Sequence, residues 1–304
     1  QATTTANISA KALTVSGLTA ADKVYDGTST ATINTSSMVT SGLITGDDFA
    51  VATTGAFRNA GNTANDKNVG TAKTVQLAST YTGNDVGNYT ITGQAVTTAN
   101  ITPKAMSITG ITAADKVYDG SAADTVSTSG LVMNGLVSGD SVNVTATGTF
   151  RNANNTANDK NAGTAKTVQL TSAYTGSDID NYTITGQSTT TATIAKKDVA
   201  FTRITADSKS YNASAATNIT TDTVSGTIGA ETLYISGSGT FESSNPGVNK
   251  TVTVNMADLT LKDGTGAWNN YQLTNTGSMT TTASIVPASP IVPTSSVLAQ
   301  LSND

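Results

Sequence analysis

The chain has 304 residues, of which 60 are threonine and 27 are glycine, and it contains no cysteine and no histidine. Their absence excludes disulfides and any site built on a thiol or an imidazole. The formal net charge of −5 argues against nucleic acid as a partner, and the lack of a run of about 18 apolar residues argues against membrane insertion.

Short runs of alternating apolar and polar residues follow one another along the chain and predict half-buried β-strands. They occur at 13–15, 49–51, 75–77, 89–91 and 252–254, and turns rich in Gly, Asn and Asp separate them. We therefore expect an all-β protein built from small antiparallel β-sandwiches of the Ig-like class. The alternative is a β-grasp-like repeat with a short helix near 39–44 or 131–137.

The chain repeats itself with a period of 93 residues. TAADKVYDG stands at 19–27 and 112–120, and NYTITGQ stands at 88–94 and 181–187. A third, diverged copy aligns Tyr211 with Tyr118. Because 93 residues suffice for an independent domain, we predict tandem domains and not a solenoid. The predicted segments are a junction or closing strand of a preceding repeat at 1–9, repeats at 10–102, 103–195 and 196–286, and a proline-containing tail or linker at 287–304.

Each repeat follows the previous one directly. TTANITPKAM at 97–106 and TTTATIAKKDV at 189–199 end one repeat and start the next, with no Gly/Ser-rich linker. This predicts stiff connections and a rod about 100 Å long or more. The same pattern at 3–13 suggests that the chain is a fragment of a longer array. The tail at 287–304 is interpreted as a linker, or as a strand donated to a neighbour.

Two recurring motifs are interpreted as structural, Tyr-Asp-Gly in the first two repeats and Asn-Tyr in all three. In Tyr-Asp-Gly we expect a core tyrosine, an aspartate that caps the turn and a glycine with positive φ. In Asn-Tyr we expect an asparagine that fixes a turn before a core tyrosine. The residues are Tyr25, Asp26, Gly27, Tyr118, Asp119, Gly120, Asn88, Tyr89, Asn181, Tyr182, Asn270 and Tyr271.

The loops offer candidates for other chemistry. Calcium takes six to eight oxygen ligands, and the candidates for it are Asp47, Asp48, Asp85, Asp178 and Asp180. Ordinary Asx turns explain the same residues, so we expect no cofactor and keep calcium as the alternative. Glycosylation would fall on the sequons at Asn154, Asn143 and Asn218. No nucleophile–base pair or phosphate loop stands out, so we expect no catalytic residues and no enzyme.

Five motifs in fixed order together resemble the YDG repeat domain. They are KVYDG (23–27, 116–120), GDD (46–48), DKNVGTAKTV (66–75), NYTI (88–91) and TANITPKA (98–105). Such repeats form stalks in large secreted bacterial adhesins of the filamentous-haemagglutinin and high-molecular-weight type. The resemblance implies an extracellular location on the bacterial cell surface, export by two-partner secretion and no enzymatic role. The third copy departs from the motif with Tyr211-Asn212-Ala213.

The expected function is that of a stalk segment that projects a distal binding region. Two alternatives stay open, a module that binds glycans or host protein directly and a fibre subunit that self-assembles by strand donation. The expected partners are neighbouring repeats of the same chain, other copies of it, and a host or matrix glycan or protein.

Overall fold

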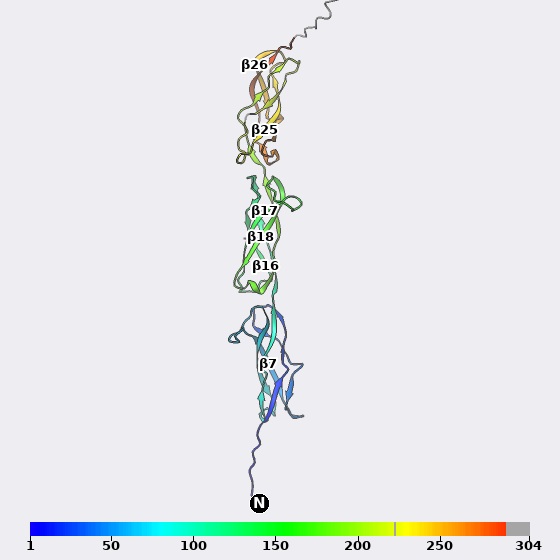
Figure 1. Cartoon of the computed structure of the whole chain (residues 1–304), viewed down its shortest axis with the longest axis vertical. Coiled ribbons are helices and arrows are strands. Elements are labelled where there is room, and N and C mark those ends of the chain that lie inside the picture. Colours follow the sequence, from blue (N-terminus) through cyan, green and yellow to red (C-terminus); the bar gives the residue numbers. More distant parts are fainter. Residues whose placement is uncertain (222, 290–304) are drawn as a thin grey trace, which may run out of the picture. The chain divides into compact units, whose positions relative to one another are not determined.

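The computed structural model describes residues 1–221 and 223–289, and strands joined by turns dominate it (Figure 1). The predicted all-β class is confirmed. In the described residues the helical segments are 3₁₀ turns, namely η1 (Val86–Asn88), η2 (Ile179–Asn181), η3 (Met256–Asp258) and η4 (Trp268–Asn270). None of the helical segments described here has the length and apolar character to cross a bilayer.

The short helix of the β-grasp alternative is wrong. The segments expected to hold it contain strands β6 (Val39–Ser41) and β16 (Val132–Asn134) instead. Each of them pairs with the first long strand of its repeat, and β-branched residues such as Val39 and Thr40 favour that extended state.

The chain forms two compact units, and each contains one outer repeat with part of the middle one. The first unit comprises Gln1–Thr112, Val126–Thr147 and Leu170–Ser188, and the second comprises Ala113–Thr125, Gly148–Gln169 and the chain from Thr189 onward. Both repeat boundaries, near residues 103 and 196, therefore lie inside a compact unit and not between the units.

The first repeat is a sandwich of two main sheets. A three-stranded sheet has the order β6-β1-β9, a five-stranded sheet has the order β3-β10-β8-β7-β4, and β2 pairs with β5. The strands are β1 (Lys11–Ser16), β2 (Thr19–Ala20), β3 (Lys23–Val24), β4 (Thr30–Ala31), β5 (Ile33–Asn34), β7 (Ala50–Phe57), β8 (Gly70–Thr82), β9 (Tyr89–Thr92) and β10 (Val96–Thr102).

The alternating sequence of these strands sorts their side chains into buried and exposed faces. Leu13 and Val15 of β1 are buried, whereas Thr14 between them is exposed, because successive side chains of a strand point to opposite faces. Val75 and Leu77 of β8 are likewise buried. The core therefore lies between the two sheets.

Parallel strand pairs add a feature that alternation did not reveal. β1 runs antiparallel to β6 but parallel to β9, and β3 runs parallel to β10. The β3–β10 pair lies at the edge of the five-stranded sheet. It places the residue after β3, Tyr25, beside the end of the strand that leads into the next repeat.

The second repeat has the same strands, divided between the units. In the first unit β11 pairs with β16 and, in parallel, with β19, and in the second unit β20 pairs with β13 and with the first half of β18. The strands are β11 (Lys104–Thr109), β12 (Thr112–Ala113), β13 (Lys116–Val117), β14 (Ala123–Asp124), β15 (Val126–Ser127), β17 (Asn143–Phe150), β18 (Gly163–Thr175), β19 (Tyr182–Thr185) and β20 (Thr189–Ala195).

The third repeat lies wholly in the second unit and differs in one long strand. The place of β8 is taken by β26 and β27, which η3 and Leu259 separate. Thr253 pairs with Thr240 and Thr260 pairs with Ser236 of β25, so η3 bulges out of the ladder. The strands are β21 (Lys197–Val199), β22 (Thr205–Ala206), β23 (Lys209–Ser210), β24 (Ala216–Thr220), β25 (Leu233–Phe241), β26 (Gly247–Asn255), β27 (Thr260–Asp263), β28 (Tyr271–Leu273) and β29 (Ser278–Val286).

Most of the predicted tail, residues 290–304, lies outside the described residues. Whether it acts as a linker or as a donated strand stays a prediction.

Candidate functional site

A single residue separates the last strand of one repeat from the first strand of the next. β10 ends at Thr102 and β11 begins at Lys104, with Pro103 between them. At the second boundary Lys196 alone stands between β20 and β21. Such short connections leave the adjoining loops close enough to interact.

Tyr25 lies at the first boundary. Its backbone N–H donates a hydrogen bond to the Thr102 carbonyl at 2.9 Å, which continues the β3–β10 pairing. Its ring is buried, and its hydroxyl donates to Oδ2 of Asp140 at 2.8 Å. Asp140 belongs to the second repeat, so the tyrosine of Tyr-Asp-Gly connects two repeats.

The Asp140 carboxylate receives three donors. The Tyr182 hydroxyl donates to it at 2.6 Å and Lys67 Nζ lies 2.7 Å away, in addition to Tyr25. The side chain is only 1% exposed. Burial raises the pKa of Asp140, but the hydrogen bonds from Lys67, Tyr182 and Tyr25 outweigh burial and hold the pKa below its usual range. The carboxylate is therefore a charged centre satisfied from both repeats.

An asparagine adds a second set of bonds across the same boundary. Oδ1 of Asn181 accepts from the Val69 N–H at 2.9 Å, and Nδ2 of Asn181 donates to Asn68 at 3.1 Å. Asn181 is buried, and a buried amide needs such partners. We call this group of contacts the first clasp. Its donor side is Tyr25, Lys67 and Val69 of the first repeat, and its acceptor side is Asp140, Asn181 and Tyr182 of the second.

The remaining residues of Tyr-Asp-Gly shape the turn behind Tyr25. Oδ1 of Asp26 accepts from the Thr28 N–H and from Lys23 Nζ, each at 2.8 Å. Gly27 has φ +79°, and a Cβ atom there would stand 2.7 Å from Cγ1 of Val137 in the second repeat. A glycine is needed at this position for its conformation and for the close approach of the two repeats.

The second boundary carries an equivalent group, the second clasp. Tyr118 donates to Oε1 of Glu231 at 2.8 Å, Tyr271 donates to Oε2 at 2.5 Å, and Lys160 Nζ lies 3.6 Å from Oε1. The Ala162 N–H donates to Oδ1 of Asn270 at 2.8 Å. The donor side is Tyr118, Lys160 and Ala162, and the acceptor side is Glu231, Asn270 and Tyr271.

Electrostatics distinguish the two clasps. Glu231 is 18% exposed and its lysine is more distant, so its ion pair is more open to water. Burial raises the pKa of Glu231, but the hydrogen bonds from Tyr271 and Tyr118 bring it below its usual range. Burial and the neighbouring carboxylates raise the pKa of Tyr182 and of Tyr271 to about 12. The phenols therefore remain donors at neutral pH.

The aromatic rings of each clasp also pack edge to face. The Tyr25 and Tyr182 ring centroids lie 5.6 Å apart at 77°, and those of Tyr118 and Tyr271 lie 5.3 Å apart at 77°. This is the favourable geometry for aromatic pairs. In both clasps a Tyr-Asp-Gly tyrosine meets an Asn-Tyr tyrosine of the next repeat.

The first repeat contains the acceptor residues too. The Tyr89 hydroxyl donates to Asp47 at 2.5 Å, as Tyr182 does to Asp140. Asn88, in contrast, is exposed.

Three of the five calcium candidates hold backbone groups of turns. Asp48 accepts from the Asn84 N–H, Asp85 accepts from the Asp48 N–H, and Asp178 accepts from the Ser141 N–H. In residues 1–221 and 223–289 no group of three or more metal-ligating side chains gathers, Asp180 included. The three sequons are exposed, Asn154 in a turn, Asn143 at the start of β17 and Asn218 in β24.

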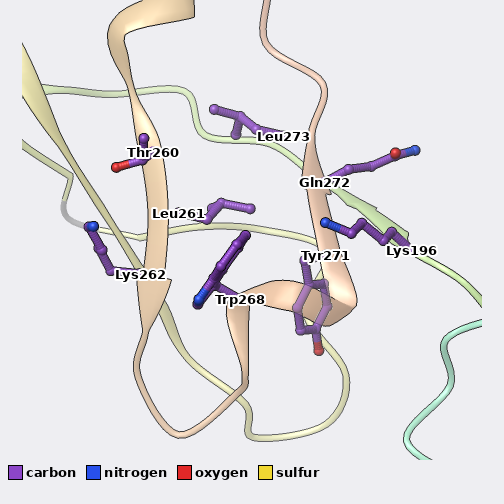
Figure 2. A pocket seen from close by; sticks show the side chains of 8 residues that line it. All are labelled: Lys196, Thr260, Leu261, Lys262, Trp268, Tyr271, Gln272 and Leu273. Atoms are coloured by element: carbon purple, nitrogen blue, oxygen red, sulfur yellow. The ribbon is translucent and has the colours of Figure 1, made fainter. Parts of the chain in front are cut away.

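A pocket of about 420 Å³ lies on the third repeat beside the second boundary. Figure 2 shows the Trp268 ring between Lys262 and Tyr271, with Leu261 above it in this view. Trp268 is 48% exposed, and Lys196 Nζ lies 5.4 Å from its ring centroid. The first two repeats have Val86 and Ile179 at the corresponding first position of the 3₁₀ turn, so the exposed aromatic ring belongs to the third repeat.

Sequence reasoning missed the ionic half of the clasps. Asp140, Glu231, Lys67 and Lys160 were not among the candidate residues. The available signal was that Asp140 repeats Asp47 and Lys160 repeats Lys67, each at a distance of 93 residues.

The fold and clasps define a protein of tandem β-sandwich repeats joined by hydrogen bonds from their own motif residues. Residues 9–99, 102–192 and 195–281 match the YDG domain, and the chain belongs to the YDG-domain family.

No curated protein matches the chain. Among solved structures, FdeC, an Escherichia coli adhesin, matches with 14% identity and a TM-score of 0.21, covering 93% of this chain and 98% of its own. A TM-score of that size supports no conclusion on fold or function.

Proposed function

We propose that this chain is a structural segment of a bacterial cell-surface adhesin, in which locked tandem repeats hold a distal binding region away from the cell. Catalysis has no part in this role. The observation that carries the proposal is the recurrence of one clasp at both repeat boundaries, made each time by the motif residues of the YDG domain. Tyrosines of the Tyr-Asp-Gly and Asn-Tyr motifs thus join repeats, which is what a stalk requires.

The physical argument rests on the connections. A one-residue link with a buried charged hydrogen-bond centre restrains two repeats more than a flexible linker would. We therefore expect the array to keep a fixed repeat-to-repeat orientation.

Small-angle scattering of the whole chain tests this expectation. Three repeats in line should give a maximum dimension of about 100 Å or more. The Asp140→Asn/Glu231→Gln double variant keeps the shape of both side chains and removes their charge, so it should broaden the distance distribution. A compact wild-type particle would contradict the proposed stalk. So would a double variant whose clasps are shown to be open by hydrogen exchange but whose scattering equals that of the wild type.

A second candidate function is the binding of an acidic carbohydrate at the Trp268 pocket. A half-exposed indole can stack against the apolar face of a sugar, and Lys196 and Lys262 supply positive charge for a carboxylate or sulfate. A glycan array tests it with Trp268→Ala and, as the matched control, Tyr234→Ala, an exposed aromatic residue outside the pocket. Binding that only Trp268→Ala removes supports the candidate, and an array without any binding refutes it.

A further inference from the structure

The first repeat carries the acceptor side of a clasp, and within residues 1–221 and 223–289 no donor side contacts it. We define this acceptor face as Ile44, Asp47, Asn88 and Tyr89. These residues correspond to Val137, Asp140, Asn181 and Tyr182 of the second repeat and to Ile228, Glu231, Asn270 and Tyr271 of the third.

The internal geometry of the acceptor face is already formed. The Ile44 N–H donates to the Tyr89 hydroxyl at 3.0 Å, and that hydroxyl donates to Asp47 at 2.5 Å. In the second repeat the Val137 N–H donates to Tyr182 at 2.9 Å. The face of the first repeat therefore has the hydrogen-bonded framework that receives a donor in the second.

The asparagine differs in exposure between the acceptor face of the first repeat and the acceptor sides of the two clasps. Asn88 is exposed, whereas Asn181 and Asn270 are buried. Among the described residues Asp47 accepts a side-chain hydrogen bond from Tyr89 alone, whereas Asp140 also receives Tyr25 and Lys67. Ile44 is 49% exposed.

We propose that this face binds the donor side of a further YDG repeat, through a Tyr-Asp-Gly tyrosine and a lysine equivalent to Lys67. The carboxylates of Asp47 and Asp85 would receive that lysine, as Asp140 and Asp178 receive Lys67 at 2.7 and 3.4 Å. The inference rests on the proposed role of the clasps as connections between repeats.

The third repeat of another copy is a poor occupant because its donor side is incomplete. Tyr211 occupies the tyrosine position, but Asn212 and Ala213 replace the aspartate and the glycine of the turn behind it. The long loop that carries Lys67 and Lys160 is replaced by residues 242–246, which contain no lysine. The occupant is therefore a repeat with a complete donor side, not this chain's third repeat.

A second observation points to the same occupant. Residues 4–9 read TTANIS and match TTANIT at 97–102, which lies in β10. Ile101 of β10 is 1% exposed, whereas Ile8 is 102% exposed. Ile8 thus lacks the sheet that buries Ile101, and a repeat docked on the acceptor face would supply that sheet.

A four-repeat chain tests the proposal. A second copy of residues 11–103 is inserted before Lys11, which recreates the one-residue proline link. The inserted copy carries Val86→Ile, the residue that the second repeat has at 179, so that its peptide differs in mass from the original 86–90. Hydrogen exchange followed by mass spectrometry compares 86–90 with 179–183, whose Asn-Tyr motifs are identical. In the original chain 86–90 should exchange faster. In the extended chain the original 86–90 follows the inserted repeat, and its exchange should slow by about tenfold or more, as expected for gained charged hydrogen bonds.

The controls separate this inference from the proposed function. In the extended chain, Asp47→Asn in the original first repeat should restore fast exchange at the original 86–90 and leave 179–183 protected. If exchange at the original 86–90 is unchanged while 179–183 stays protected, the proposal for the acceptor face is overturned and the proposed function stands. Fast exchange at 179–183 in the original chain would overturn the clasps, and with them the proposed function. Sedimentation of the original chain should show a monomer, and a dimer abolished by Asp47→Asn would overturn the choice of occupant.

Discussion

The Tyr25 hydroxyl donates a 2.8 Å hydrogen bond to Asp140, which lies 115 residues further along the chain and in the next repeat. The bond joins the tyrosine that gives the YDG domain its name to a buried carboxylate. It places the motif at the boundary between repeats, where its loss would affect how repeats are joined before it affects how each one folds.

Replacing Tyr25 with phenylalanine should weaken the first clasp with little change of shape. The variant removes one hydrogen bond to a charged acceptor, worth about 1–3 kcal/mol, and leaves Asp140 with Lys67 and Tyr182. We expect a loss of that size in the free energy of unfolding, measured with denaturant. Tyr211→Phe is the matched control, because Tyr211 is half exposed at the same position of the third repeat, and it should cost under about 0.5 kcal/mol.

The two clasps should differ in the strength of their ion pairs. Lys67 lies 2.7 Å from a carboxylate that is 1% exposed, whereas Lys160 lies 3.6 Å from one that is 18% exposed. A double-mutant cycle with Lys67→Gln and Asp140→Asn should give a coupling energy of about 1–2 kcal/mol at the first clasp. The cycle with Lys160→Gln and Glu231→Gln should give under about 1 kcal/mol at the second. Equal couplings would show that burial does not govern these pairs.

Acid should open both clasps. The pKa of Asp140 and the pKa of Glu231 are lower in the folded chain than their ordinary values of 3.8 and 4.5. The unfolded chain therefore binds more protons in this range, and stability falls as pH falls. The contribution is complete above the ordinary values and is lost as pH drops through the lower, folded ones. Unfolding measured from pH 6 downward should show this loss, and Asp140→Asn should flatten the part due to the first clasp.

Much of the fold could be predicted because the alternation of apolar and polar residues is a local property of the sequence. The alternation of Leu13, Thr14 and Val15 predicts a half-buried strand, and the structure has β1 there. The direction of pairing could not be predicted in the same way. Alternation is the same in parallel and antiparallel ladders, so the parallel β1–β9 pair follows from topology alone.

The clasps also contain residues that the sequence predicts and residues that it does not. Tyr25 was expected in the core because of its motif and size, and it is buried. Its partner Asp140 was not expected, because an aspartate in a Gly-Asp turn looks the same in sequence whether it caps a loop or accepts a bond from another repeat. Asp47 and Asp48 illustrate the ambiguity, since one accepts from a tyrosine and the other from a backbone N–H.

Gly27→Ala should be the most damaging small change at the first clasp. A left-handed backbone costs a non-glycine residue about 1–2 kcal/mol, and here the new Cβ would also stand 2.7 Å from Cγ1 of Val137. Gly46→Ala separates the two costs, because Gly46 has φ +101° but a Cβ atom there would have no neighbouring atom within 4 Å. Overpacking costs about 1–3 kcal/mol, so Gly27→Ala should exceed Gly46→Ala by that amount in denaturant unfolding. If the two losses were equal, Val137 would be moving aside, and the close approach of the repeats at Gly27 would contribute little to their connection.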